Sequence, residues 1–414
     1  MALRQAAHAV AAAPASEAAG LAAALLMDCA RFGVAPAPVG TIYRALAEGR
    51  LAPLTVPAFN VRGLTFDVVS AVYRRAMELD AAGVMFELAP SEAAVADQSF
   101  AQYAALVCAA AATTGYRGPV LIQGDHFTVE SDDDASVAEV EGLARSALDS
   151  GFLQLDLDAA ALAVEGSSAA ARQDRNAAVT AGLMARLAPR APAGAIFGGE
   201  VGEIGGANTT PEELDVFVDL VRRHAGAAAG AFGKVSVQTG TRHGGMTDAS
   251  GKPARMPLDT ALARELADVA RAKGLPGIVQ HGASTLQSDQ FAALPGCGVV
   301  EVHLATNLQD LVFDSPAFPP ELRAELVAAA LGGPAGAAER GADTSGVGDQ
   351  LFRQRRWSLW GPFKRRLLDL PDETRAGLAA GVADWAGDLM VAFGLAGRAA
   401  ELRGLYTGAA ASGR

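Results

Sequence analysis

Four of the six histidines in this 414-residue chain stand at the ends of short apolar runs. They are His126, His243, His281 and His303. Neutral imidazole is a common zinc ligand, and three histidines with one open coordination position form a frequent type of catalytic zinc site. A single histidine at such a place is more often a hydrogen-bonded structural residue. The prediction of a metal site therefore depends on several of the four converging on one place.

Carboxylates accompany these histidines. Asp125 directly precedes His126, and Asp158 and Glu200 end two further apolar runs. A carboxylate beside a metal ligand can transfer a proton while its neighbour binds the metal. Taken alone, Asp125 could equally be the N-cap of a following helix.

Lysines are rare, and their positions argue against an imine mechanism. The chain has Lys234, Lys252, Lys273 and Lys364. Carbon–carbon chemistry through a Schiff base needs a lysine at the reacting centre. Lys234 opens an apolar run, so we expect it at the far end of a strand, and the other three fall in loops, helices or the C-terminal part. The sequence thus predicts a metal as the electrophile.

The elements that must position these residues form a repeating pattern. Short apolar runs alternate with alanine-rich helical stretches, which is typical of parallel βα units. The runs begin near Val56, Gly83, Pro119, Phe152, Ala195, Lys234, Gly277 and Gly298. Eight such units over about 250 residues predict an α/β fold of the (β/α)8 TIM-barrel type, with its chemistry at the carboxyl ends of the strands. A doubly wound sheet is the alternative, but the first run lacks a GxGxxG turn.

The expected barrel spans residues 51–330, with helical extensions over 1–50 and 331–414. The formal net charge of −12 disfavours nucleic acid and anionic membranes as partners. No run reaches the roughly 18 apolar residues of a membrane span. Cys29, Cys108 and Cys297 are widely separated, which favours reduced thiols and a cytoplasmic protein without a signal peptide.

Glycines and hydroxyl residues follow the candidate ligands. Gly244 follows His243, Gly282 and Ser284 follow His281, and Thr306 follows His303. A phosphate site built from the loops after strands seven and eight recurs in barrels, and glycine lets backbone N–H groups approach an anion. These positions are therefore candidates for phosphate binding.

Together these segments resemble the class II, zinc-dependent, fructose-bisphosphate aldolase family. The resemblance extends from about Val56 to Gln309 and is carried, in family order, by the motifs PAFNV, GDH, GFLQLDLD, GGEVGEIGG, TGTRHGG, VQHGAS and GVVEVHLATNLQ. It implies a mobile zinc ion on His126, His243 and His281, with Glu200 and Asp158 as carboxylates of an alternative metal position.

The resemblance also implies roles toward the substrate, a phosphorylated ketose such as fructose 1,6-bisphosphate. Asp125 matches the acid/base aspartate that exchanges a proton with the C4 hydroxyl, and Asn60 matches an asparagine facing the substrate. The matches to the dihydroxyacetone-phosphate site are Gly244, Gly282, Ser284 and Thr306. A homo-oligomer, a dimer or larger, is expected, and a monovalent cation near the phosphate is left open.

The chain departs from the family pattern at several positions. Gln123 replaces a histidine that is not a ligand. Ala207 and Asn208 stand where the loop glutamate that exchanges the C3 proton is expected, which leaves Glu203 or Glu212 as substitutes. His303 and Ala305 replace Asn and Asp, which changes the expected substrate contacts. Candidates for binding a second phosphate are Arg353, Arg355, Arg356, Arg365 and Arg366.

The leading hypothesis is a zinc-dependent aldolase that cleaves or forms the C3–C4 bond of a phosphorylated ketose. One alternative is a non-catalytic barrel subunit of the kind found in tagatose-bisphosphate aldolase systems, although such a subunit has no need of three zinc histidines. A metal-dependent barrel hydrolase is a further alternative. It usually carries an HxH pair in its first strand, where this chain has PAFNV.

Overall fold

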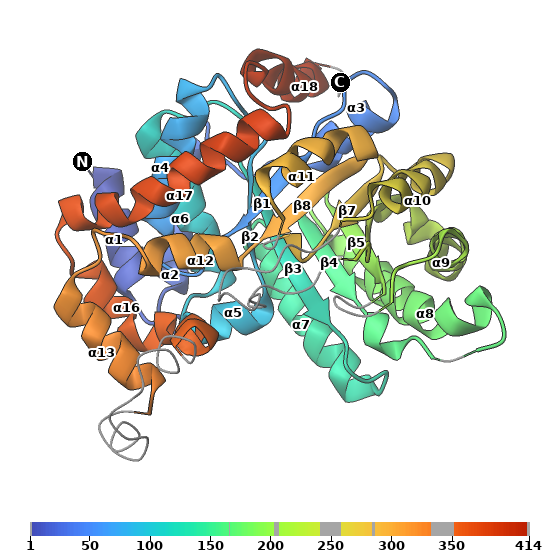
Figure 1. Ribbon diagram of the computed structural model, residues 1–414, viewed down its shortest axis with the longest axis horizontal. Helices are drawn as coiled ribbons and strands as arrows, with labels where there is room; N and C mark the ends of the chain where they lie inside the picture. Colours follow the sequence, from blue (N-terminus) through green and yellow to red (C-terminus); the bar gives the residue numbers. More distant parts are fainter. Residues whose placement is uncertain are drawn as a thin grey trace.

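Eight parallel strands close into a single barrel, in which each strand pairs with its neighbours in sequence and β1 also pairs with β8 (Figure 1). The computed structural model describes residues 2–164, 166–202, 207–240, 258–283, 286–332 and 352–411. The strands are β1 (Val56–Asn60), β2 (Met85–Leu88), β3 (Leu121–Thr128), β4 (Gln154–Asp158), β5 (Ile196–Val201), β6 (Phe232–Val237), β7 (Ile278–Gln280) and β8 (Val299–Leu304). The predicted (β/α)8 fold is confirmed.

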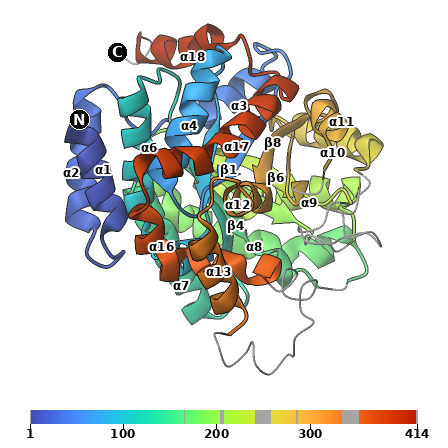
Figure 2. The same cartoon turned by 60° about the vertical axis from the view of Figure 1, so that its left-hand side comes forward.

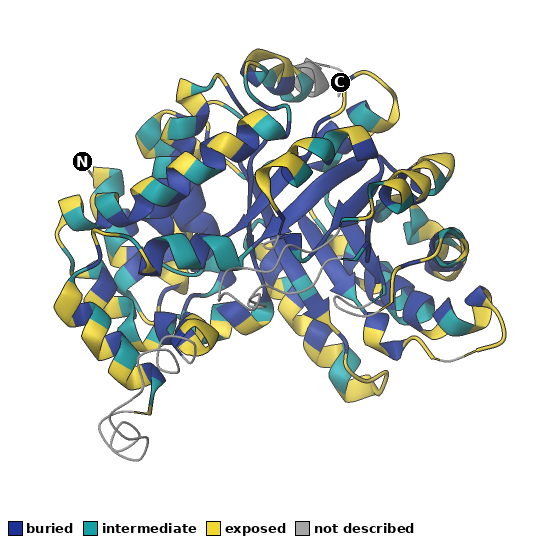
Figure 3. Ribbon diagram, viewed as in Figure 1, coloured by how far each residue is buried: buried dark blue, intermediate teal, exposed yellow. Residues whose placement is uncertain are grey.

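The strands are almost entirely buried, as the dark blue barrel in Figure 3 shows. Side chains alternate between the barrel interior and the surrounding helices. Phe59 of β1 and Phe86 of β2 face outward, where Tyr73 and Trp385 of covering helices contact them. Glu87, the next residue of β2, consequently points into the barrel. This alternation explains how charged residues can occur inside fully buried strands.

Helices surround the barrel and account for most of the remaining chain. They are α1 (Ala2–Ala12), α2 (Ala19–Arg31), α3 (Gly40–Ala47), α4 (Thr65–Glu78), α5 (Pro90–Val95), α6 (Phe100–Thr114), α7 (Asp134–Asp149), α8 (Ala169–Leu187), α9 (Pro211–Ala225), α10 (Thr260–Ala272), α11 (Ser288–Ala293), α12 (Thr306–Phe313), α13 (Pro320–Ala330), α16 (Trp360–Leu368), α17 (Asp372–Ala392) and α18 (Ala399–Ala411). Asp133 caps α7, since its side chain accepts hydrogen bonds from the N–H groups of Ala135 and Ser136.

Both ends of the chain pack on the barrel helices (Figure 2). At the N-terminal end, Gln102 of α6 donates to the carbonyls of Val10 and Ala13, which fixes α1. At the C-terminal end, α17 lies along α4 and α12. Trp360 of α16 covers Gly63, where a Cβ atom would come within 2.2 Å of the indole ring. The C-terminal helices therefore contact the segment that follows β1.

Two further features agree with the sequence. Cys29, Cys108 and Cys297 are buried and form no disulfides. Among the residues described, no helix combines the length and apolar character that a membrane crossing requires.

Candidate active site

A bulge in β3 brings two adjacent residues to the barrel mouth. The register with β4 shifts between Gly124 and Phe127, and His126 adopts a positive φ of 48°. This left-handed conformation costs a non-glycine residue about 1–2 kcal/mol and is found mainly where structure or function requires it. A Cβ atom on Gly124 would lie 2.4 Å from the Phe127 ring, so the bulge needs glycine there. The bulge explains why Asp125 and His126 can both face the site.

His126 belongs to a group of four residues that we call the rim cluster: His126, Asp158, Glu200 and His281, from the ends of β3, β4, β5 and β7. His126 Nδ1 lies 3.2 Å from Glu200 Oε1 and 3.5 Å from Asp158 Oδ2. His126 Nε2 lies 3.1 Å from His281 Nδ1. Four of the predicted metal-binding residues, from the ends of four strands, thus meet at one point.

The rim cluster fits a metal ion. Ligand atoms of His126, Glu200 and His281 lie within 4.8 Å of one another, whereas two ligands on a tetrahedral zinc are about 3.3 Å apart given the usual Zn–N length. Glu200 Oε1 is buried and has no hydrogen-bond partner among the described residues, although His126 is near. His281 Nε2 lies 2.9 Å from Ser236 Oγ, so an Nε2–H group donating there leaves the Nδ1 lone pair for a metal.

Burial governs the protonation of the rim cluster. Burial, reinforced by the charge of Asp158, raises the pKa of Glu200 to about 7. Burial, together with the nearby His303 and His126, lowers the pKa of His281 well below its usual range. Burial opposes the charged form of His126, but Asp125 and Glu200 outweigh it and raise the pKa of His126. His281 is therefore neutral, the form that binds metal.

A second group lies deeper in the barrel, and we call it the floor cluster: Glu87, Asp156, Lys234, Glu301 and His303. Lys234 Nζ donates to Asp156 Oδ2 at 2.9 Å and to Glu301 Oε1 at 2.6 Å. His303 Nε2 lies 2.7 Å from Glu301 Oε1, and His303 Nδ1 lies 3.1 Å from Glu87 Oε2. All five side chains are 5% exposed or less.

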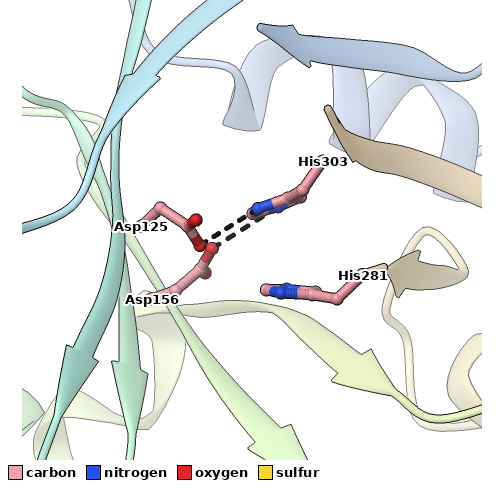
Figure 4. A group of neighbouring side chains, drawn as sticks. All are labelled: Asp125, Asp156, His281 and His303. Carbon is pink, nitrogen blue, oxygen red and sulfur yellow. Dashed lines mark hydrogen bonds and ion pairs between the residues drawn. The ribbon is translucent and has the colours of Figure 1, made fainter. Parts of the chain in front are cut away.

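Asp125 lies where the two clusters meet. Its Oδ1 atom lies 3.0 Å from His303 Nδ1 on the floor and 3.8 Å from His126 Nε2 on the rim. Figure 4 shows Asp125 and Asp156 facing His281 and His303 across the barrel. Burial favours the neutral carboxyl, yet the imidazoles of His126 and His303 lower the pKa of Asp125 well below its usual range. Asp125 is therefore ionised and able to accept a proton.

The expected position of Lys234 is wrong. It is the third residue of β6 instead of its opening residue, and its side chain is fully buried at the barrel centre. The room comes from Gly198 of β5, where a Cβ atom would lie 2.2 Å from Asp156 Oδ1 and 3.0 Å from Lys234 Cγ. Burial opposes the ammonium form, but Asp156 and Glu301 outweigh it and raise the pKa of Lys234. Lys234 is therefore a poor imine-forming nucleophile because its ammonium group is paired with carboxylates, and not because it lies at the far end of a strand.

The floor cluster is a weaker metal site than the rim. Asp125, Asp156, His281 and His303 also offer ligand atoms within 4.8 Å of one another. However, the Lys234 ammonium already neutralises Asp156, and both ring nitrogens of His303 face carboxylates. A divalent cation here would be repelled by Lys234. The donor set therefore favours the rim cluster for metal.

Asn60 ends β1 and is held by a polar network that the sequence did not reveal. Its amide donates to Glu92 Oε2 at 2.7 Å, and Arg62 Nε donates to Asn60 Oδ1 at 3.1 Å. Arg62 also pairs with Glu92 at 2.7 Å. Gln309 Oε1 accepts from Arg62 and from the Trp360 indole at 3.3 and 3.2 Å. The C-terminal helices are thereby linked to Asn60.

The remaining predicted residues are less informative. Gly282 follows His281 with a φ of 67°, and Thr306 begins α12. Glu212 lies exposed in the first turn of α9. His243, Gly244, Ser284 and Glu203 lie outside the described residues.

The candidate phosphate arginines mostly contact acidic residues or backbone near the barrel's C-terminal helices. The described contacts join Arg353 and Arg356 to Asp314, Arg355 to the Ala330 carbonyl, Arg365 to Asp369 and Arg366 to Glu325.

Sequence reasoning missed the floor cluster, although a signal for it exists. Asp156 and Glu301 stand two residues before Asp158 and His303, and residues two apart on a strand face the same side. A charged residue two positions before a predicted site residue on the same strand is therefore expected to point into the barrel interior as well.

Comparison with solved structures supports the fold. Fructose-bisphosphate aldolase from Campylobacter jejuni matches with a TM-score of 0.52 and 15% identity, covering 88% of this chain and 96% of that one. Fructuronate-tagaturonate epimerase UxaE from Cohnella laeviribosi matches with a TM-score of 0.58 and 13% identity, covering 88% and 84%. A probable tagatose 6 phosphate kinase from Sinorhizobium meliloti 1021 matches with a TM-score of 0.57 and 17% identity, covering 82% of this chain and 100% of that one.

No curated protein sequence matches the chain significantly. The family model for class II fructose-bisphosphate aldolase, in contrast, matches residues 41–329, which include all eight strands and both clusters. Since that match covers more than half of the sequence, the chain belongs to the class II fructose-bisphosphate aldolase family.

Proposed function

We propose that the protein is a zinc-dependent aldolase that cleaves or forms the C3–C4 bond of a phosphorylated ketose. The products of cleavage are dihydroxyacetone phosphate and an aldehyde. The observation that carries this proposal is the rim cluster, in which His126, Glu200 and His281 converge beside the ionised carboxylate of Asp125. Family membership supports the same reaction class.

The residues divide the work as follows. His126 and His281, with Glu200 and Asp158 beside them, would hold the metal, and His243 completes the proposed ligand set. The bound ion would act as a Lewis acid toward the ketone oxygen and stabilise the negative charge left after cleavage. Asp125 accepts the proton of the C4 hydroxyl as the C3–C4 bond breaks, so that the C4 fragment leaves as an aldehyde. In the reverse direction Asp125 returns that proton.

Several features of the chain serve this step. His281 is oriented by Ser236, so its ring presents Nδ1 to the rim. Asp125 and His281 are at most 6% exposed, and electrostatic interactions are stronger in such a water-poor environment. Gly282 and Thr306, on the segments after β7 and β8, are proposed to hold the substrate phosphate, with Gly244 and Ser284. Asn60 is proposed to face the substrate.

A chelation experiment tests the proposal. The purified protein is analysed for zinc and assayed against a panel of ketose mono- and bisphosphates, before and after dialysis against a chelator and after zinc is restored. We expect about one zinc per chain and retro-aldol cleavage that disappears on chelation and returns with zinc. Cleavage that survives complete metal removal contradicts the mechanism. A metal-free protein that is silent on every substrate supports a non-catalytic subunit instead.

A further inference from the structure

We propose that Lys234, Glu301 and His303 are positioning residues, which form a buried chain of charges that holds the Asp125 carboxylate in one orientation for proton transfer. The inference rests on the proposed function, because it takes Asp125 as the acid/base. It assigns His303 to Asp125, whereas the family resemblance suggested a contact with substrate.

The first link is between His303 and Asp125. His303 Nδ1–H donates to Asp125 Oδ1 at 3.0 Å, and the carboxylate side chain is only 8% exposed. His126 also approaches Oδ1, at 3.8 Å. Since the imidazoles of His303 and His126 both lie nearest Asp125 Oδ1, Asp125 Oδ2 is the atom that would accept the substrate proton. A carboxylate held at one oxygen keeps the other in a fixed direction.

The second link fixes His303 itself. Its Nε2 atom lies 2.7 Å from Glu301 Oε1, opposite the bond to Asp125, and its ring stacks on His281 with centroids 4.0 Å apart. Nδ1 thus faces the carboxylates of Asp125 and Glu87, and Nε2 faces Glu301 and the Gln123 amide, so the ring is held on both sides. An asparagine at this position has a single short amide and could not span the two carboxylates. The imidazole therefore bridges Asp125 to the floor of the barrel.

The third link anchors Glu301. Lys234 Nζ lies 2.6 Å from its Oε1, and the Tyr43 hydroxyl donates to its Oε2. Lys234 is held in turn by Asp156 at 2.9 Å. Lys234 and the carboxylates of Asp156 and Glu301 are fully buried. Buried, hydrogen-bonded charges of this kind orient the groups they touch, as partners behind metal and catalytic histidines do elsewhere.

Steady-state kinetics of zinc-loaded variants test the chain. We expect His303→Asn to lower kcat by about 10–100-fold, with KM within about twofold of the wild-type value and the zinc content unchanged. Glu301→Gln, which keeps the shape but removes the charge, should lower kcat by about tenfold. His224→Asn, a change of an exposed histidine on α9 beside Asp174, is the matched control and should have no effect. Lys234→Arg keeps the charge and should lose less activity than Lys234→Met.

A spectroscopic measurement gives a second readout that does not depend on turnover or metal. In metal-free protein labelled with ¹⁵N-histidine, the six histidines give few signals, and those of His303 are the ones missing from His303→Asn. We expect the shifts of the His303 ring nitrogens to change in Asp125→Asn and in Glu301→Gln, because each variant alters the partner of one ring nitrogen. Thermal melting of each variant checks that it is folded.

The outcomes separate the two proposals. An active wild type whose His303→Asn variant keeps its kcat but has a raised KM overturns the positioning role and assigns His303 to the substrate. His303 shifts that stay unchanged in both Asp125→Asn and Glu301→Gln also overturn it. An inactive wild type whose His303 shifts respond to both variants overturns the proposed function, while the chain of contacts itself stands.

Discussion

The rim and the floor of the barrel contain similar residue types but balance their charges differently. On the floor, the carboxylates of Asp156 and Glu301 share ion pairs with a cation of the chain itself, Lys234, at 2.9 and 2.6 Å. On the rim, the described ion-pair partners of Glu200 and Asp158 are histidines, and the described residues offer Glu200 Oε1 no hydrogen bond. Buried charge must be compensated. Among the described residues, Glu87 Oε1 and Asp156 Oδ1 on the floor lack a hydrogen-bond partner just as Glu200 Oε1 does, so the two regions differ in their cation. The floor contains a lysine of the chain itself, whereas the rim has histidines and the character of a site for an external cation.

The largest effect is expected at Asp125, where the two regions meet. Asp125→Asn keeps the size of the side chain but removes its ability to accept a proton. General acid–base catalysis contributes about 10²–10⁴-fold, so kcat/KM for ketose cleavage should fall by that factor. Zinc content, measured by elemental analysis, should not change. Asp132→Asn, at an exposed carboxylate paired with Arg175, is the control, and wild-type turnover by Asp125→Asn would contradict the assignment.

Removing the internal cation should destabilise the floor. Lys234→Met leaves Asp156 and Glu301 buried without their partner, which costs about 3–5 kcal/mol of unfolding free energy. Lys273→Met breaks contacts with Asp215 and Asp219, which are 50% exposed, and should cost about 0–1 kcal/mol. Urea unfolding of the metal-free proteins, followed by circular dichroism, measures both. Equal stabilities would contradict the description of Lys234 as the cation that compensates the buried carboxylates of the floor.

Zinc affinity should depend strongly on the rim carboxylate Glu200 and little on the floor carboxylate Glu301. Glu200→Gln removes a rim ligand and should weaken zinc binding by at least about tenfold, since even partners behind ligands contribute 10–100-fold. Glu301→Gln, on the floor, should leave zinc affinity within about threefold. Competition with a coloured chelator gives both constants. If Glu301→Gln weakens binding as much as Glu200→Gln, the metal position lies deeper than proposed.

The pH dependence of binding should also locate the metal. Burial raises the pKa of Glu200 to about 7, so in the metal-free protein Glu200 is protonated below that pH and ionised above it. Zinc binds the ionised form, so affinity should fall as pH drops below about 7, by about tenfold per unit for each proton displaced. The slope in Glu200→Gln should be smaller by one proton. An unchanged slope would exclude Glu200 as a ligand.

The barrel and much of the rim could be predicted because their signals are local. Buried parallel strands are short apolar runs bounded by glycine, and histidines at their ends stand out. The bulge could not be predicted, since it depends on Phe127 and Leu155 closing over Gly124. The position of Lys234 within its strand could not be predicted, because Gly233 separates Phe232, where β6 begins, from the apolar run after the lysine.

Gly198 also limits how this barrel can vary. Gly198 of β5 pairs with Asp156 of β4 and with Lys234 of β6, so β5 contributes no side chain at this level and the lysine stem fills that volume. Any larger residue at 198 would compete with the charged atoms for the same space. A side chain at 198 would meet the Asp156 carboxylate at 2.2 Å before it meets the lysine stem at 3.0 Å, so a smaller residue at 234 would not by itself make room for it. The absence of a side chain at 198 is therefore a condition for keeping the buried ion pair of Asp156 and Lys234.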